Sequence, residues 1–526
     1  MAEAAALPAG PARLAVRPRP PAALLGAAAI GPVLVLLPLG FTLLEAARVP
    51  PGRAVALLFR PLVGELLLNT VGLVLATTAT AALIGTAAAW LVERTALPAR
   101  GAWAVLAAMP LAIPPFVSSY AWISLSPALQ DFVGAWIVVT CSYYPLVYLP
   151  VAASLRGMDP TLEETGRSLG QGPWRCFFRI VLPQLRPALL GGMLLVALNV
   201  LVEFGAFSLL RFRTFTTALY VEYRTGFNGG EAALIAVVLL LLCLACLGLE
   251  LRIRGGASYA RIGRGTRRRA GRHPLGWATL PVLAGFAGLV AATCGVPLGM
   301  IVYWLTRHGT AAISPVEVSA GLLLQATFAS VWLGLAGAAT TVALALPLGF
   351  LTARYRGRFV TLLERAAFLA QGVPGIVVAL ALIAMTIRAL HPLYQTAALL
   401  IAAYAIVFLP LALVSVRAAL VQAQRGLEEA GRSLGLGWVA VAWRVVLPVA
   451  GPGVGAAAAL VFVSIVTELT ATLLLAPIGT QTLATQVWAD TSTLAFAAAA
   501  PYAALMAVLS LLSTWLLARR FAVAAL

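Results

Sequence analysis

Two glutamates stand inside long apolar stretches of this 526-residue chain, where a charged side chain is costly. Glu203 lies in the sequence NVLVEFG and Glu468 in the sequence VTELT. They occupy matching places in two stretches that resemble each other, so we expect them to share a role. Carboxylates that face each other could attract a cation along a substrate pathway or hold a gate shut through hydrogen bonds. Alternatively, each is a structural glutamate that bonds to a neighbouring segment or reaches the outer interface.

The same two carboxylates are a poor closed metal site, because they have no histidine or cysteine companions. The CxxC pair of Cys243 and Cys246 lies in leucine-rich sequence with no second pair nearby. Its thiols are therefore expected to act as small apolar residues. We expect no bound metal and no catalytic residues.

A charged segment with potential for docking occurs twice in the chain. The sequence LEETGRSLG at 162–170 returns as LEEAGRSLG at 427–435, shifted by 265 residues. Glu203 and Glu468 are related by the same shift, and Ile113-Pro114 matches Val373-Pro374 at a shift of 260. The chain is therefore interpreted as two homologous halves that run in the same direction.

The chemistry of the repeated segment suits contact with another protein. Each copy predicts a short helix that stops at a glycine, Gly170 or Gly435, because glycine tolerates the left-handed turn that ends helices. An amphipathic piece with aromatic and arginine side chains follows and finishes at Leu-Pro. Such helices suit a partner's groove. The alternative is an interfacial helix that rests on lipid headgroups.

The elements that carry these residues must lie in a membrane. Of the residues, 61% are hydrophobic and 10% charged, which is more apolar surface than a soluble domain can bury. Apolar runs of the ~20 residues needed to cross a bilayer recur along the chain. We predict twelve spans, near 22–47, 65–92, 102–124, 132–155, 187–210, 231–251, 276–305, 325–352, 362–388, 395–420, 452–475 and 496–518.

The net charge of +18 is distributed as in a membrane protein and not as in a nucleic-acid-binding one. Every basic residue is an arginine, and the arginines gather beside alternate span ends. Since cytoplasmic loops carry this excess, both termini and the central connector are predicted to be cytoplasmic. The bias is imperfect, because several arginines fall on the opposite side: Arg48, Arg53, Arg60, Arg211, Arg213 and Arg224.

The repeat and the charge pattern divide the chain into three parts. Residues 1–254 form the first transmembrane half and residues 276–526 the second. Residues 255–275 are an arginine-rich cytoplasmic linker, interpreted as a solvated basic connector that contacts lipid headgroups at most.

These residues carry a family resemblance. The motif consists of a glutamate, two small residues, three further residues, a glycine, nine residues and I-x-L-P. The segment from Glu164 to Pro183 resembles this motif at every spacing, and so does the segment from Glu429 to Pro448, with Val445 in place of isoleucine. This pattern is the cytoplasmic signature of binding-protein-dependent ABC importer permeases. Thr165-Gly166 and Ala430-Gly431 depart from the usual two alanines.

The resemblance implies an all-α integral membrane fold of twelve transmembrane helices in two parallel six-helix repeats, the type I ABC importer permease fold. It implies that the repeated loops couple to two copies of an ABC ATPase subunit, with Glu164, Gly170, Glu429 and Gly435 at that contact. It also implies a periplasmic or lipid-anchored solute-binding protein as partner, and the bacterial inner membrane as location.

The stretches after Glu203 and Glu468 resemble those of fused ferric-iron permeases most. Related fused permeases for thiamine or aminoethylphosphonate share the architecture, so these substrates stay open.

An independent observation separates this chain from ATP hydrolysis. A P-loop needs a lysine to reach the phosphates, and the chain has no lysine. The chain is therefore predicted not to be an enzyme, and ATP is expected to be used by the partner. A stand-alone secondary transporter of twelve spans is the alternative from another class, but it would need no doubled docking loop. A membrane scaffold or receptor fits the symmetric glutamates less well.

Overall fold

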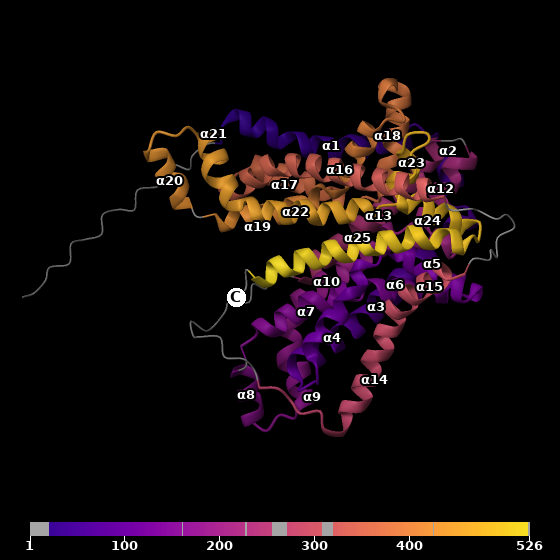
Figure 1. Ribbon diagram of the computed structural model, residues 1–526. Coiled ribbons are helices and arrows are strands. Elements are labelled where there is room, and N and C mark those ends of the chain that lie inside the picture. Colours follow the sequence, from indigo (N-terminus) through magenta and orange to yellow (C-terminus); the bar gives the residue numbers. More distant parts are fainter. Residues whose placement is uncertain are drawn as a thin grey trace, which may run out of the picture.

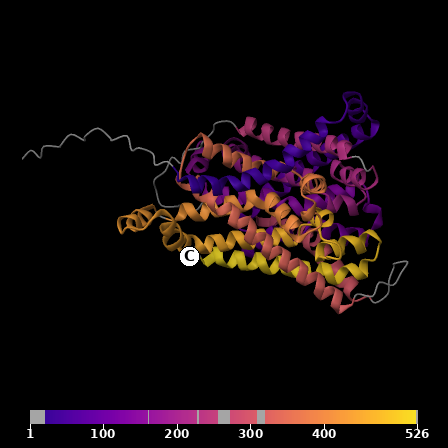
Figure 2. The ribbon, with the colours of Figure 1, turned by 90° about the horizontal axis from the view of Figure 1, so that it is seen from above.

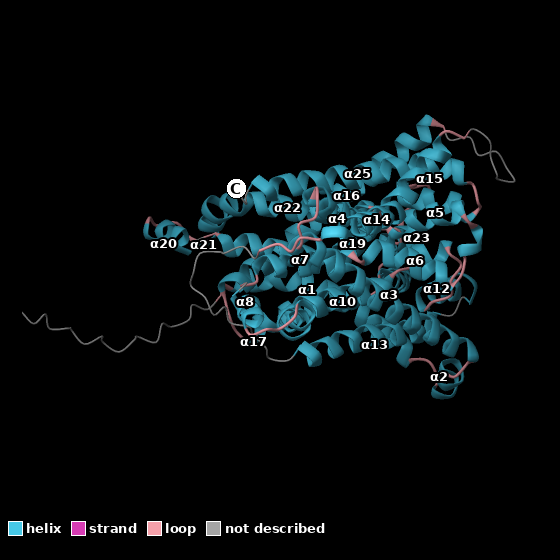
Figure 3. Cartoon of the chain, turned by 90° about the horizontal axis from the view of Figure 1, so that it is seen from below, coloured by secondary structure: helices cyan, strands magenta, loops and turns pink. Residues whose placement is uncertain are grey.

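The computed structural model describes residues 20–159, 161–226, 229–254, 271–307, 319–423 and 425–523. These residues form helices joined by loops, with no β-sheet among them (Figures 1 and 3). The predicted all-α fold is therefore confirmed. Most of the predicted linker, residues 255–270, lies outside the described residues.

Helices of the two halves follow one another in the same order. The first half contains α1 (Ala22–Ala47), α2 (Pro51–Leu58), α3 (Pro61–Arg94), α4 (Arg100–Ala108), α5 (Pro115–Leu125), α6 (Phe132–Tyr143), α7 (Pro145–Gly157), α8 (Thr161–Ser168), α9 (Pro173–Cys176), α10 (Leu182–Val202), α11 (Gly205–Leu209), α12 (Phe215–Val221) and α13 (Gly229–Arg254). The second half contains α14 (Thr279–Val290), α15 (Val296–Leu305), α16 (Ala320–Arg354), α17 (Arg358–Leu369), α18 (Gly375–Ala389), α19 (Ala397–Gln422), α20 (Arg425–Ser433), α21 (Trp438–Val441), α22 (Leu447–Val466), α23 (Thr470–Leu475), α24 (Leu483–Ser492) and α25 (Phe496–Val523).

Ten helical segments of the described chain are long and apolar enough to cross a membrane, and two bent pairs bring the number to twelve. The bent pairs are α4 with α5, at 93°, and α17 with α18, at 105°. Each bend falls at the repeated Ile113-Pro114 or Val373-Pro374. Proline has no N–H and disfavours a helical residue before it, so the helix ends there. The third and ninth predicted spans are therefore broken helices.

The central packing of the two halves is the same. In the first half α3, α7 and α10 pack on one another, and in the second α16, α19 and α22 do so. Small residues allow the close approach: a Cβ atom on Gly85 of α3 would lie 2.9 Å from the backbone of Tyr144 and Tyr148. Such contacts are the usual basis of helix association in lipid.

The first membrane span of each half, α1 or the continuous α14–α15 segment, packs against the other half. Helix α1 packs against α16, α17 and α18, and α15 packs against α5 (Figures 1 and 2). The two halves are therefore intertwined, although they are consecutive in sequence.

Short elements gather at the two ends of the helix bundle. Helices α8, α9, α20 and α21 lie at one end, here called the α8/α20 end (Figures 1 and 3). Helices α2, α12 and α24 lie at the opposite, α12/α24 end. Candidate residues from the repeated loops and from the glutamate segments are thus separated along the bundle.

Candidate functional site

Glu203 directly follows α10 and is bonded within its own half. One carboxylate oxygen accepts a hydrogen bond from the Tyr143 hydroxyl at 2.6 Å. The other accepts from the backbone N–H of Ala206 at 2.9 Å, at the start of α11. The carboxylate therefore links the end of α10 to α6 and to the next short helix.

Glu468 occupies the matching place after α22 and caps α23. Its carboxylate oxygens accept from the N–H groups of Thr470, Ala471 and Thr472 at 3.1, 2.9 and 3.3 Å. Free N–H groups at a helix start favour such an anion. In the part of the chain that the structure describes, no hydrogen bond joins Glu468 to Glu203, so each carboxylate is held by its own half.

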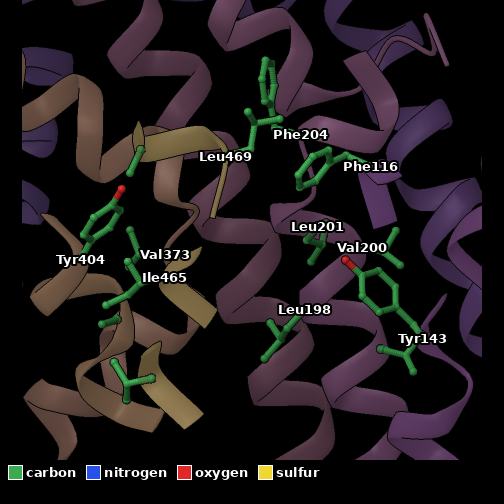
Figure 4. Packing of buried hydrophobic residues seen from close by; sticks show 14 of the residues in the cluster. Phe116, Tyr143, Leu198, Val200, Leu201, Phe204, Val373, Tyr404, Ile465 and Leu469 are labelled. Atoms are coloured by element: carbon green, nitrogen blue, oxygen red, sulfur yellow. The ribbon is translucent and has the colours of Figure 1, made fainter. Parts of the chain in front are cut away.

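The residues that meet between the halves are the next ones along the chain. Phe204 and Leu469 are equivalent by the 265-residue shift, and they are 1% and 4% exposed. Leu469 lies beside Phe204 and Phe116 in Figure 4. A Cβ atom on Gly205 would lie 2.8 Å from Cδ2 of Leu469. The approach is close enough to form an apolar closure between the two glutamate segments.

A second contact between the halves lies at the α12/α24 end. Thr214 and Thr482 each form a capping box, at the start of α12 and of α24. They align the two helices at a shift of 268 residues, which pairs Tyr220 with Trp488. The rings of these two residues lie 6.1 Å apart. Two equivalent residues that touch must straddle the axis relating the halves, so this axis passes between them.

The repeated loops end their first helix as predicted. Gly170 has φ +78° and Gly435 has φ +84°. In the first loop Gly170 N–H donates to Arg167 and Gln171 N–H to Gly166, at 2.9 and 3.1 Å. The second loop repeats both bonds. This is a Schellman motif, and it requires the left-handed residue that glycine provides.

The predicted second helix of each loop is not separate. Helices α9 and α21 continue through one π-helical turn, Phe177–Val181 or Ala442–Val446, directly into α10 or α22. The loop is therefore continuous with the span that ends at Glu203 or Glu468.

The first helix of each repeated loop, α8 or α20, has a buried and an exposed glutamate. The predicted Glu164 and Glu429 are exposed, whereas the preceding Glu163 and Glu428 are buried. Glu428 accepts from Nε of Arg354 at 2.6 Å, where α16 ends. Glu163 lies 3.8 Å from Nη1 of the equivalent Arg94, where α3 ends. Sequence reasoning missed these anchors, although the 260-residue match of the two arginines was a usable signal.

Gly166, which replaces an alanine of the usual motif, is tightly packed. A Cβ atom on Gly166 would lie 2.5 Å from Cδ1 of Ile180 and 3.3 Å from Sγ of Cys176. Glycine therefore lets α8 rest directly on the π-helical turn. Leu169 and Leu434 point away from this contact and are 76% and 83% exposed, which leaves an apolar side chain on each loop.

The end of the linker is fastened to the first loop alone. His273 exchanges backbone hydrogen bonds with Arg94 and Ala96 at 2.9 Å. Its ring nitrogen lies 2.7 Å from Arg167 and 3.6 Å from Glu163. Beside the described residues of the second loop no equivalent of the His273 segment is present.

Metal-ligand clusters are absent from the described ranges, where no three His, Cys, Asp or Glu side chains come together. Glu203 and Glu468 therefore belong to no metal-binding cluster among these residues.

Comparisons with known proteins agree with this geometry. The family model described as "Binding-protein-dependent transport system inner membrane component" matches residues 81–250 and again 345–521. An Fe(3+)-transport system permease protein of Haemophilus influenzae is 39% identical over 482 residues, which cover 91% of this chain and 95% of that protein.

More distant relatives match about a third of the chain. A molybdenum transport system permease protein of Escherichia coli K12 is 30% identical over 35% of this chain and 86% of its own length. A sulfate transport system permease protein of Synechocystis is 30% identical over 32% of this chain and 67% of its own length.

Proposed function

Because the chain belongs to the family of binding-protein-dependent transport system inner membrane components, we propose that it is the fused permease of an ATP-driven ferric-iron importer. The observation that carries the choice of iron is the similarity to an Fe(3+) permease over 91% of the chain. The molybdenum and sulfate relatives match about a third of the chain at lower identity. The chain is a multi-pass inner-membrane protein and not an enzyme by family.

The proposal places the α8/α20 end in the cytoplasm, together with both termini and the linker. Arginines at this side of the spans support the orientation. Each loop then receives one ATPase subunit, so that two copies bind. Exposed Glu164 and Glu429, and the apolar tips Leu169 and Leu434, supply the charged and apolar parts of the two contacts.

The division of the chain at residues 255–275 belongs to the same proposal. A match to 35% of this chain covers 86% of the molybdenum permease protein, and the family model matches this chain twice, so one chain here supplies two such units. Because both halves belong to one chain, every permease has one copy of each repeated loop.

Coupling follows from how the loops are attached. When the ATPase subunits close, α8 and α20 move with them and carry the anchored ends of α3 and α16 through the Arg94–Glu163 and Arg354–Glu428 pairs. The π-helical turns pass the same movement into α10 and α22. Those helices run ~30 Å to the glutamate segments, at 1.5 Å per residue.

The far ends of α10 and α22 hold the closure. Separation of Phe204 from Leu469 opens a route between the halves, and the two carboxylates beside it attract a ferric ion briefly. The attraction must stay weak, because the solute also has to leave. ATP hydrolysis by the partner subunits thus opens the gate from the opposite end of the bundle, and no covalent bond in this chain changes.

The test is reconstitution. The permease is placed in proteoliposomes with the ATPase and the iron-loaded binding protein encoded beside it, and radioactive ferric iron is followed. We expect uptake that needs both ATP and the binding protein, with no competition by thiamine or aminoethylphosphonate. Competition by either compound would reassign the substrate. Uptake driven by an ion gradient without the ATPase would identify a secondary transporter instead.

A further inference from the structure

Three exposed arginines lie at the α12/α24 end of the first half: Arg211, Arg213 and Arg224, here called the outer arginine face. Arg211 and Arg213 lie in the loop between α11 and α12. No side-chain hydrogen bond or ion pair within the described residues involves either guanidinium. Arg224 donates to the Tyr220 hydroxyl at 3.0 Å and lies over that ring. The face therefore offers positive charge to a partner.

The second half provides an internal comparison. At the 268-residue shift that aligns α12 with α24, the equivalents of the three arginines are Gly479, Gln481 and Ser492. All three are neutral. At these three positions the two halves therefore share their backbone course but differ in charge, with three arginines in the first half and neutral residues in the second.

The backbone conformation of Arg211 is a further difference between the two halves. Its φ is +52°, and its equivalent Gly479 has φ +82°. Glycine adopts this left-handed region freely, whereas a side chain with a Cβ atom is strained there. The first half keeps an arginine where the fold favours glycine, which indicates that the charge has a use outside folding.

Membrane topology does not account for these charges. Arginines normally gather on the cytoplasmic side, and the outer arginine face lies at the other end of the bundle. A ferric cation would be repelled by three guanidinium groups, so the face does not serve the cargo. Arg224 rests on Tyr220, which touches Trp488 across the axis. The face therefore extends from the loop to the contact between the two halves.

We propose that the outer arginine face receives an acidic surface on one lobe of the solute-binding protein, and that the neutral second half takes the other lobe. This inference rests on the proposed function, since it requires a binding protein. The charge difference then fixes which way round a two-lobed carrier sits over the pseudo-symmetric permease. Electrostatic complementarity of this kind sets orientation and association rate.

A matched pair of variants tests the proposal in the permease–ATPase complex, held in phosphatidylcholine nanodiscs. Arg213→Gln and Gln481→Glu each lower the charge by one at equivalent positions. The affinity for the iron-loaded binding protein encoded beside the permease is measured at several salt concentrations. We expect Arg213→Gln to weaken binding at least fivefold at low salt and to flatten the salt dependence, and Gln481→Glu to weaken binding less than Arg213→Gln does.

A double variant, Arg211→Gly with Arg213→Gln, gives the first loop the residues of the second. It should weaken binding more than tenfold while its melting temperature stays the same or rises, because glycine relieves the backbone at position 211. Moving the charge, with Arg213→Gln and Gln481→Arg together, should not restore affinity.

Several results would overturn the inference. Unchanged affinity and salt dependence in the double variant would remove the docking role, as would an equal loss in Gln481→Glu. A loss seen only after phosphatidylglycerol is added would assign the arginines to lipid phosphates. If the wild-type complex itself neither binds the carrier nor imports iron, the proposed function fails instead, which is a separate outcome.

Discussion

Nε of Arg354 lies 2.6 Å from the carboxylate of Glu428, and the same guanidinium donates to the carbonyls of Leu420 and Ala423 at 3.0 and 2.9 Å. One side chain thus joins the end of α16, the end of α19 and the coupling helix α20. In the first half Nη1 of Arg94 lies 3.8 Å from Glu163, while Nε and Nη2 of Arg94 are buried without a hydrogen-bond partner among the described residues. The coupling helices are consequently fastened to the transmembrane bundle by buried charge.

Replacing Glu428 by glutamine should loosen α20. Removing one partner of a buried ion pair leaves the other uncompensated, which costs about 3 kcal/mol. We expect faster amide hydrogen exchange in α20 and ATP hydrolysis that responds less to the binding protein.

Glu429→Gln is the matched control, because Glu429 is the next residue on the same helix and is exposed. It should leave exchange in α20 unchanged within about 0.5 kcal/mol, as for most surface substitutions. It should weaken binding of the ATPase subunit instead. Identical effects of the two variants on both measurements would contradict the inward and outward assignment.

The helix stop at Gly435 gives a second prediction. Gly435→Val forces a β-branched residue into φ +84°, which costs about 2 kcal/mol. The turn should open, and transport should fall together with assembly of the ATPase. Gly437→Val is the control: neither glycine has an atom within 4 Å of its Cβ position, but only Gly435 has a positive φ. A normal transport rate for Gly435→Val would show that the turn is dispensable.

Much of the fold followed from periodic apolar runs and from the repeat. The type I architecture and the membership of the importer family are confirmed. The breaks at Pro114 and Pro374 were less accessible, since a proline in an apolar run is compatible with a kinked span. Only tertiary packing decides that the chain turns by 93° and 105° there.

The sites divide in a similar way. The stop glycines follow from local backbone chemistry, so sequence alone located them. Glu163 and Glu428 depend on which face of a short helix meets the bundle, and adjacent glutamates look alike in sequence. The pairing of Tyr220 with Trp488 was hidden because the stretch between Glu468 and α24 is longer by three residues than the stretch between Glu203 and α12, which changes the shift from 265 to 268.

Asp490 gives a pH-dependent prediction outside the spans. One of its carboxylate oxygens is buried without a partner among the described residues, with Tyr502 nearby. Burial raises the pKa of Asp490 to about 6 from an ordinary value of 3.8. The folded protein therefore holds this proton more tightly than the unfolded chain. Its contribution to stability is present below about pH 4 and is lost as the pH rises to about 6.

Asp490→Asn should remove that slope. We expect the free energy of unfolding of this variant at pH 7 to exceed that of the wild type by about 2 kcal/mol, which raises its melting temperature. The difference should shrink below pH 4. Thermal unfolding of the detergent-solubilised protein from pH 4 to 8 measures it. Glu222→Gln, at the equivalent position of the first half, is the control. A constant difference at all pH values would mean that protonation of Asp490 is not involved.

The last prediction concerns the charge at Glu203 and Glu468. Glutamine at 203 can still accept from Ala206 and turn its amide toward the Tyr143 oxygen, so the fold around it should be kept. Glutamine at 468 has one acceptor oxygen for a cap that now uses both, which costs about 1 kcal/mol. The double variant should therefore fold.

If the carboxylates attract the cation as it passes, the double variant should import ferric iron at least tenfold more slowly while hydrolysing ATP at the wild-type rate. Tyr143→Phe separates charge from structure, because it removes the 2.6 Å hydrogen bond to Glu203 and leaves the carboxylate in place. Its uptake should stay within twofold of the wild type. If instead the double variant transports normally and Tyr143→Phe lowers the melting temperature, the glutamates serve as helix caps and the apolar contact of Phe204 with Leu469 carries the gate alone.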